Sequence, residues 1–185
     1  MADSALTKRV LADALKELMQ KKPLAKISVG DITAHCGINR QTFYYHFKDK
    51  YDLVAWIYST ETLEFMSSFS DSAHWADGIC ELCLYMQANK KFYINALSTP
   101  GQNSFEEYFT QFLQGLVTAL IDESAVGGRL SAEDKEFIAD FYSFAFVGLV
   151  MKWARGGMRE DPHHYVDHIK DLVDGSMMRE LDKYR

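Results

Sequence analysis

The sequence has little of what defines several common classes of protein. Its 185 residues include only three prolines and three cysteines. An odd number of cysteines without framework spacing argues against a disulfide-stapled secreted protein and indicates a reducing compartment. The chain shows no secretory N-terminal pattern and no continuous apolar run of the ~20 residues that a membrane span needs. These absences predict a cytoplasmic protein without a membrane segment.

Motifs for catalysis and cofactor binding are also missing. We find no glycine-rich phosphate loop, no G-x-S-x-G elbow and no dinucleotide fingerprint. Cys80 and Cys83 form a C-x-x-C without a second pair or nearby histidines, so buried structural thiols explain them better than a zinc or redox site. His163, His164 and His168 lack the acidic partner of an H-E-x-x-H motif and are read as surface histidines. The sequence predicts no enzyme, no metal and no cofactor.

Charge is distributed unevenly along the chain. The formal net charge of −6 would by itself argue against a nucleic-acid partner. Residues 1–50, however, hold nine Lys and Arg against five Asp and Glu, whereas the remainder holds 11 against 21. The positive excess therefore marks the N-terminal quarter as the part that would meet phosphates.

Residues 27–50, ISVGDITAHCGINRQTFYYHFKDK, predict two short helices around a glycine turn. Ser28 and Asp31 have the spacing of a capping box, and Gly37 suits a left-handed helix end. Asn39 is a suitable N-cap for the second helix. This is the layout of a helix-turn-helix, whose second helix enters the major groove of DNA.

Side chains that hydrogen-bond to bases and phosphates gather around the second helix. A helical hairpin that never meets DNA is the alternative interpretation. The candidate DNA-binding residues are Ser28, Asn39, Arg40, Gln41, Thr42, Tyr44, Tyr45, His46, Lys48 and Lys50.

The run DITAHCGINRQTFYYHFKDKYDL resembles the N-terminal signature of TetR-type transcriptional regulators, including its aromatic pair and Tyr-His-Phe ending. The resemblance implies a helix-turn-helix domain over residues 1–48 and an effector-sensing and dimerisation domain over residues 49–185. It also implies that Arg40, Gln41 and Thr42 lie near base edges. The residues that it places near phosphates are Ser28, Tyr44, Tyr45, His46 and Lys50.

Hydrophobic periodicity predicts helices throughout the chain. The expected helices cover residues 4–22, 28–36, 39–47, 49–69, 74–88, 90–97, 103–123, 131–155 and 162–181. The expected fold is all-α, with a three-helix helix-turn-helix head, a C-terminal helical bundle and about nine helices in total.

The segment NKKFYINALSTPGQNSFEEYF resembles the effector domain of a TetR subset that includes activators of dihydroxyacetone kinase operons. This second resemblance admits a protein instead of a small molecule as effector, and activation instead of the repression that most of the family exerts.

Aromatic residues of the C-terminal domain are candidates for an apolar effector pocket, although a plain hydrophobic core explains them equally well. The candidates are Trp75, Tyr85, Met86, Phe92, Tyr93, Phe109, Phe112, Phe141 and Phe144.

The predicted helix that contains residues 137–154 is apolar on nearly every side and must be buried all round. It is either an internal core helix or one that also contacts a second subunit; the TetR resemblance favours a dimer built on the last two helices. The candidate interface residues are Tyr142, Phe146, Leu149, Val150, Trp153, Ile169, Leu172 and Val173.

The sequence thus predicts a homodimeric transcriptional regulator, a repressor in the first instance, that binds a palindromic double-stranded operator and responds to a small-molecule or protein effector. One alternative is an activator whose C-terminal domain binds a partner protein. The other is a helical protein that binds a small molecule and no DNA.

Overall fold

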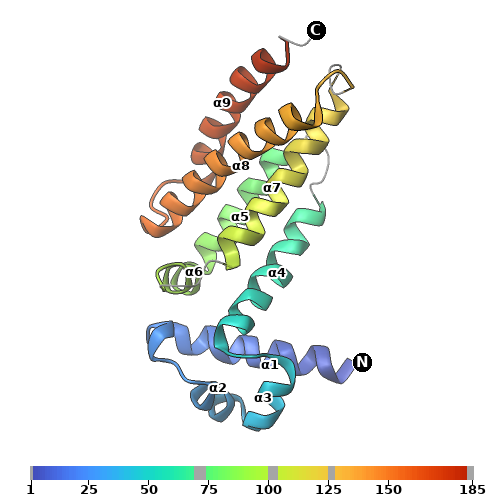
Figure 1. Ribbon diagram of the computed structural model, residues 1–185. Coiled ribbons are helices and arrows are strands. Elements are labelled where there is room, and N and C mark those ends of the chain that lie inside the picture. Colours follow the sequence, from blue (N-terminus) through green and yellow to red (C-terminus); the bar gives the residue numbers. More distant parts are fainter. Residues whose placement is uncertain (1, 69–73, 100–103, 125–127, 183–185) are drawn as a thin grey trace. The chain divides into compact units, whose positions relative to one another are not determined.

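A computed structural model describes residues 2–68, 74–99, 104–124 and 128–182 (Figure 1). Over these residues the chain forms nine α-helices and one 3-10 helix, without a β-strand. The all-α prediction is confirmed, while residues 69 and 103, the expected ends of two helices, lie outside the described ranges. The elements are α1 (Ala2–Met19), η1 (Leu24–Lys26), α2 (Val29–Cys36), α3 (Arg40–His46), α4 (Lys50–Ser68), α5 (Trp75–Ala88), α6 (Lys90–Leu97), α7 (Ser104–Glu123), α8 (Ala132–Arg155) and α9 (Pro162–Asp182).

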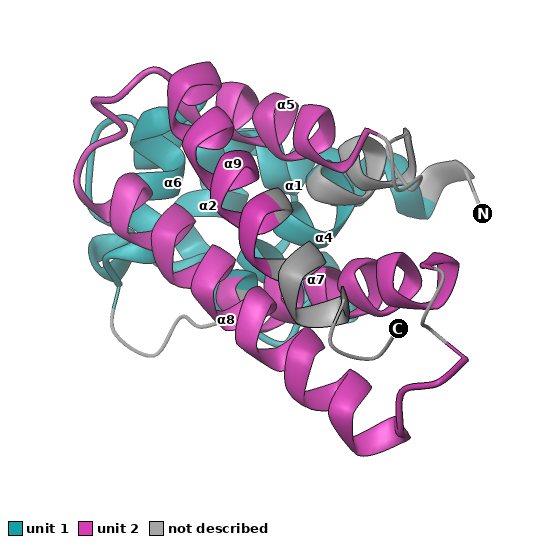
Figure 2. Cartoon of the chain, turned by 90° about the horizontal axis from the view of Figure 1, so that it is seen from above, with its two compact units in different colours: residues 1–61, 89–105 teal, residues 62–88, 106–185 magenta. Residues whose placement is uncertain are grey.

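The chain divides into two compact units, coloured separately in Figure 2. Unit 1 comprises residues 1–61 and 89–105, and unit 2 comprises residues 62–88 and 106–185. Helix α6 therefore belongs to the same unit as the helix-turn-helix, although it lies far from it in sequence. The functional boundary after residue 48 remains a prediction.

The head of unit 1 is built on the buried faces of its first three helices. Helix α1 packs against α2 and α6, and α2 packs against α3. Leu15 of α1, Ile32 of α2 and Phe43 of α3 have no exposed surface. Burying an apolar side chain of this size contributes about 1.5–3 kcal/mol each, so this shared core holds the three helices together.

Unit 2 is held by its long C-terminal helices. Helix α5 packs against α9. The Tyr165 hydroxyl of α9 donates to the Leu149 carbonyl of α8 at 2.7 Å, and the Tyr165 ring stacks on Trp153. Nearer the other end of α8, the hydroxyls of Tyr142 and Ser176 lie 3.0 Å apart. These contacts place α8 and α9 antiparallel to each other.

Helix α8 is long and apolar enough to cross a membrane when judged by length and composition alone, although the sequence predicted no membrane segment. More than half of its apolar window, 56%, is buried within the chain. A helix that buries one apolar face in its own core and exposes a second apolar face has this composition without spanning a membrane.

Candidate nucleic-acid interface

Local hydrogen bonds fix the helix-turn-helix. The Ser28 hydroxyl accepts the Asp31 N–H at 3.1 Å, and the Asp31 carboxylate accepts the Ser28 N–H at 2.8 Å, which completes the predicted capping box of α2. Gly37 ends α2 with φ +70°, in the left-handed region. The Asn39 side chain accepts the Gln41 N–H at 2.7 Å and caps α3. These three local predictions are confirmed, and together they set the angle at which α3 leaves the turn.

The inner face of α3 is anchored by aromatic contacts. Phe43 and Phe47 are buried with ring centroids 5.8 Å apart, and the Phe47 ring meets Trp56 of α4 edge-on at 5.9 Å. The opposite face points to solvent, where Tyr44 and Tyr45 are 53% and 83% exposed. Large exposed phenols on a rigid helix are unusual in a monomer's surface and favour a binding face.

The ten candidate DNA-binding residues fall into four groups. Thr42 and His46 are half-buried, whereas the side chains of Ser28 and Asn39 are exposed but hold the caps of α2 and α3. The freely exposed group consists of Arg40, Gln41, Tyr44, Tyr45 and Lys48.

Lys50 forms the fourth group by itself, because its ammonium turns inward. Its Nζ donates to the carbonyls of Leu24 at 2.8 Å, Ala25 at 3.3 Å and Ile27 at 2.7 Å. Burial lowers the pKa of Lys50 below its usual value, an effect that Asp31 and Asp49 oppose. All three donors of the ammonium therefore have backbone partners. The interpretation of Lys50 as a phosphate ligand did not foresee this structural role.

The Asp31 carboxylate is stabilised in its charged form. The Ser28 N–H and hydroxyl donate to it, and the Lys22 ammonium lies 3.3 Å away. The hydrogen bonds from Ser28, more than the lysine, lower the pKa of Asp31 from 3.8 to about 2. The capping box is therefore fully formed at neutral pH.

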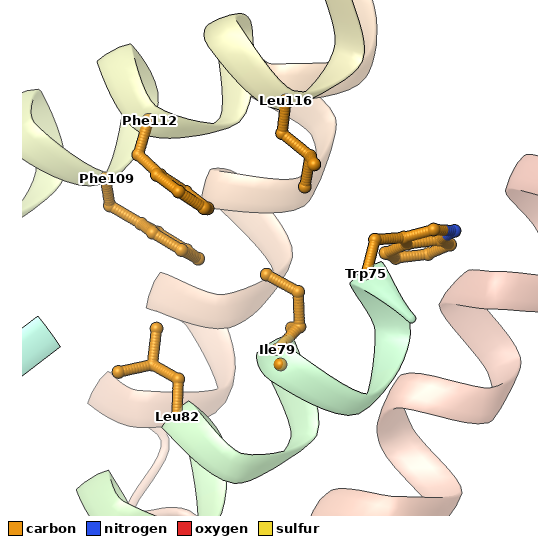
Figure 3. A pocket seen from close by; sticks show the side chains of 7 residues that line it. Trp75, Ile79, Leu82, Phe109, Phe112 and Leu116 are labelled. Atoms are coloured by element: carbon orange, nitrogen blue, oxygen red, sulfur yellow. The ribbon is translucent and has the colours of Figure 1, made fainter. Parts of the chain in front are cut away.

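A small apolar cavity lies in unit 2 between α5 and α7 (Figure 3). Its volume is about 10 Å³, enough for roughly one water molecule. Of the nine residues expected to line an effector pocket, Trp75, Phe109 and Phe112 do so. They are joined by Gly78, Ile79, Leu82 and Leu116.

The other expected pocket residues lie elsewhere. Phe92 and Tyr93 are fully buried in the aromatic core of unit 1, with Tyr58. Phe141 and Phe144 are 61% and 59% exposed on α8 and do not line this cavity. Met86 is buried and Tyr85 half-buried, and neither lines the cavity. The sequence identified these aromatic residues, but it did not reveal which of them lie in the core of unit 1, which line the cavity of unit 2 and which are exposed on α8.

A histidine meets the C-x-x-C pair, contrary to the sequence reading. His163 at the start of α9 places its Nδ1 3.2 Å from Cys80 Sγ. Burial raises the pKa of Cys83 to about 12 and also raises that of Cys80, so both remain thiols at neutral pH. Among the described residues no three His, Cys, Asp or Glu side chains gather as a metal site. The cysteines are best read as packing residues.

The predicted dimer residues mostly face the core of their own chain. The exception is Leu172, which is 68% exposed; Leu149 is half-buried. The buried ones are Tyr142, Phe146, Val150, Trp153, Ile169 and Val173. The structure instead exposes the other face of α8, because a helix apolar on all sides gives no sequence signal for which side meets its own core.

We define the apolar stripe as Phe137, Phe141 and Phe144 of α8 with Leu172 of α9. Their side chains are 59–72% exposed. Gly148 continues the same face of α8 one turn further, with open space around it. A stripe of three exposed phenylalanines at helical spacing is typical of a protein–protein contact.

Comparison with known proteins assigns both parts of the chain. Residues 11–57 match the family described as bacterial regulatory proteins, tetR family, and residues 73–175 match a transcriptional regulator C-terminal region. The HTH-type dhaKLM operon transcriptional activator DhaS of Lactococcus lactis subsp. lactis (strain IL1403) is 29% identical over 151 residues, 80% of each chain.

Solved structures share the fold. The dihydroxyacetone kinase operon activator DhaS superposes with a TM-score of 0.73 at 24% identity, covering 98% of this chain and 99% of that one. NalD, the secondary repressor of the MexAB-OprM multidrug efflux pump in Pseudomonas aeruginosa, gives a TM-score of 0.64 at 20% identity, covering 92% and 95%. With a capped helix-turn-helix, an exposed outer face of α3 and family matches over both parts, the chain belongs to the TetR family of transcriptional regulators and is a DNA-binding regulator, not an enzyme.

Proposed function

We propose that the protein acts as a cytoplasmic homodimer that binds a palindromic operator through α3 of each protomer and is modulated by an effector at its C-terminal part. The observation that carries the proposal is the outer face of α3, which offers Arg40, Gln41 and Tyr44 to solvent from a helix anchored by Phe43. Bidentate donors on an anchored helix suit the edges of bases in the major groove.

The apolar stripe supports the dimer. A second copy of the chain placed on it by a two-fold axis would remove four large apolar side chains from water and pair like with like. A two-fold dimer also doubles the contacts that one small head makes, with recognition helices about one DNA turn, roughly 34–36 Å, apart or a multiple of it. This surface replaces the buried residues of the sequence-based interface as the proposed contact.

The cavity between α5 and α7 is the proposed start of the effector site. Its lining of Trp75, Phe109 and Phe112 is apolar, so the effector class that it favours is a hydrophobic molecule or the apolar side chain of a partner protein. Since it now holds only about 10 Å³, an effector of either class has to widen it.

For the direction of regulation we propose activation, on the likeness to the DhaS activator across 80% of the chain. Repression, which the sequence first favoured, is the alternative. A reporter fused to the regulated promoter separates them: deletion of the gene should lower transcription under inducing conditions. A rise in transcription on deletion would establish repression.

The dimeric binding mode is tested by native mass spectrometry on protein bound to its upstream intergenic DNA. We expect two chains per DNA duplex, and footprints on two half-sites related by two-fold symmetry. A single chain on a single half-site would contradict the dimeric mode while leaving DNA binding intact.

A further inference from the structure

Asn95 of α6 reaches the backbone that joins α1 to α2. Its Oδ1 accepts the Leu24 N–H at 2.8 Å. Its Nδ2 donates to the carbonyls of Met19 at 3.2 Å and Lys22 at 3.0 Å. Rotating the amide by half a turn would set donor against donor at Leu24, so these partners fix its orientation. We call these three bonds the Asn95 clamp.

The clamp satisfies groups that their own segment leaves unpaired. Met19 is the last residue of α1, and carbonyls in the last turn of a helix have no partner within that helix. The α1 terminus is followed by Pro23 and the short η1 helix, and Pro23, the N-cap residue of η1, makes no side-chain cap hydrogen bond. Asn95 therefore serves as the cap of the α1 end and of the start of η1, although it is supplied from about 70 residues further along.

The N–H, the carbonyl and the side chain of Leu24 are all fixed by contacts. Asn95 binds its N–H, Lys50 of α4 binds its carbonyl at 2.8 Å, and its side chain is fully buried. Two helices, α6 and α4, thus converge on one residue of η1, and the last residue of η1 lies two residues before the Ser28 cap of α2. Because only Ile27 lies between η1 and the Ser28 cap, the placement of η1 in space constrains the placement of α2, and through its packing against α2 that of α3.

We propose that Asn95 is a positioning residue for DNA recognition: through its clamp, α6 sets the placement of η1 and thereby of α2 and α3, without touching DNA. The inference rests on the proposed operator binding.

Two substitutions separate the bonds of the clamp. Asn95→Ala removes all three, whereas Asn95→Asp keeps the acceptor for Leu24 and removes both donors. Ser98→Ala, at the exposed end of the same helix, is the matched control. Each variant is compared with the unmodified protein by fluorescence anisotropy on upstream intergenic and scrambled DNA over a series of salt concentrations, and by hydrogen exchange of the Leu24 amide.

We expect Asn95→Ala to weaken selective binding at least about tenfold, because hydrogen bonds that hold the recognition helix in place are lost. The slope of log affinity against log salt should stay as in the unmodified protein, since no phosphate contact is removed. Exchange at Leu24 should accelerate in Asn95→Ala but stay slow in Asn95→Asp, and Ser98→Ala should match the unmodified protein in both readouts.

Selective binding that stays unchanged in both Asn95 variants would overturn the inference even if Leu24 exchanged faster. A flatter salt slope would also overturn it, because it would mean a direct contact with DNA. If circular dichroism shows that Asn95→Ala does not fold, the selective DNA binding of Asn95→Asp alone decides whether the inference holds. Failure of the unmodified protein to bind would count against the proposed function, whereas the clamp itself would still be read from Leu24 exchange.

Discussion

At the scale of single residues, some charged side chains of the helix-turn-helix stabilise the fold and others are available to DNA. The Lys50 ammonium donates to the backbone carbonyls of Leu24, Ala25 and Ile27, whereas Lys48, two positions earlier, is exposed. Two lysines that look equivalent in the sequence are therefore expected to differ in role: Lys50 stabilises the fold, and Lys48 contacts DNA.

Lys50→Ala should destabilise the protein, because hydrogen bonds to a charged donor contribute about 1.5–3 kcal/mol each and the three carbonyls lose theirs together. Lys48→Ala should leave the midpoint of urea unfolding unchanged and instead lower the salt dependence of DNA binding by about one counterion. Urea unfolding and salt titration of each variant provide the check. A Lys50→Ala protein of unaltered stability with a flattened salt slope would restore Lys50 as a phosphate ligand.

Asp31 should give the protein a distinct response to acid. Its folded-state pKa of about 2 lies below its ordinary value of 3.8, so its contribution is present above pH about 4 and is lost as the pH falls toward 2. Asp31→Asn should therefore be less stable than the unmodified protein at pH 7, with the difference shrinking at low pH. Denaturant unfolding at several pH values measures this difference in stability. A difference that does not change with pH would argue that the charged Asp31 carboxylate does not stabilise the capping box of α2.

Arg40 should determine sequence preference. We expect Arg40→Ala to cost about 1–3 kcal/mol on the operator and little on scrambled DNA if its guanidinium forms a bidentate contact with a base. Competition binding with the two DNAs measures the ratio directly. An equal loss on both would move Arg40 from base recognition to phosphate binding.

At the scale of elements, most helix boundaries were predictable because their signals are local, but α1 ends at Met19 and not at the expected residue 22. Capping side chains start α2, α3 and α8, and a left-handed glycine ends α2. These signals require only the residues within one turn, so the sequence predicted all nine helices. The three-residue η1 was not predicted, because its position depends on Asn95 and Lys50 from distant elements.

Two glycine-to-alanine substitutions should change the stability of the protein in opposite directions, according to the backbone conformation at each position. Gly37→Ala should destabilise the protein by about 1 kcal/mol, because residue 37 has φ +70° and an L-residue is strained there. Gly115→Ala, on an exposed face of α7 with open space around it, should stabilise by roughly 0.5–1 kcal/mol through helix propensity. Thermal unfolding of the pair decides, and a shift of the same sign in both would contradict the assigned backbone conformations.

Faces of helices were harder to predict than their boundaries. For α8 the sequence predicted burial on every side, and the structure buries Tyr142 and Trp153 while exposing Phe141. Which side of such a helix meets its own core depends on the complementary shape of α9 and α5, and this information is not contained in any single segment. The same reason separates Phe141 from the cavity that it was expected to line.

At the scale of the whole molecule, assembly should depend on the apolar stripe. Phe141→Glu should yield soluble, folded monomers in sedimentation velocity, because the charge is added at an exposed position. Trp153→Glu, which places a charge at a buried position of the same helix, should instead unfold unit 2. A Phe141→Glu protein that remains a dimer at low micromolar concentration would place the interface elsewhere.

The head and the body of the chain also differ in charge, and this difference favours a single orientation on DNA. Positive charge concentrates in residues 1–50, and the acidic remainder is repelled by phosphates. Association should therefore be steered head first and should weaken steeply with salt.

The most direct test is fluorescence anisotropy of the purified protein on its own upstream intergenic DNA and on scrambled DNA of equal length, at two salt concentrations. Our account predicts tighter binding to the upstream DNA, with an affinity that falls as salt rises. Since an activator can require its effector before it binds, the titration is repeated with extract of induced cells. Absence of selective binding under both conditions would contradict the account.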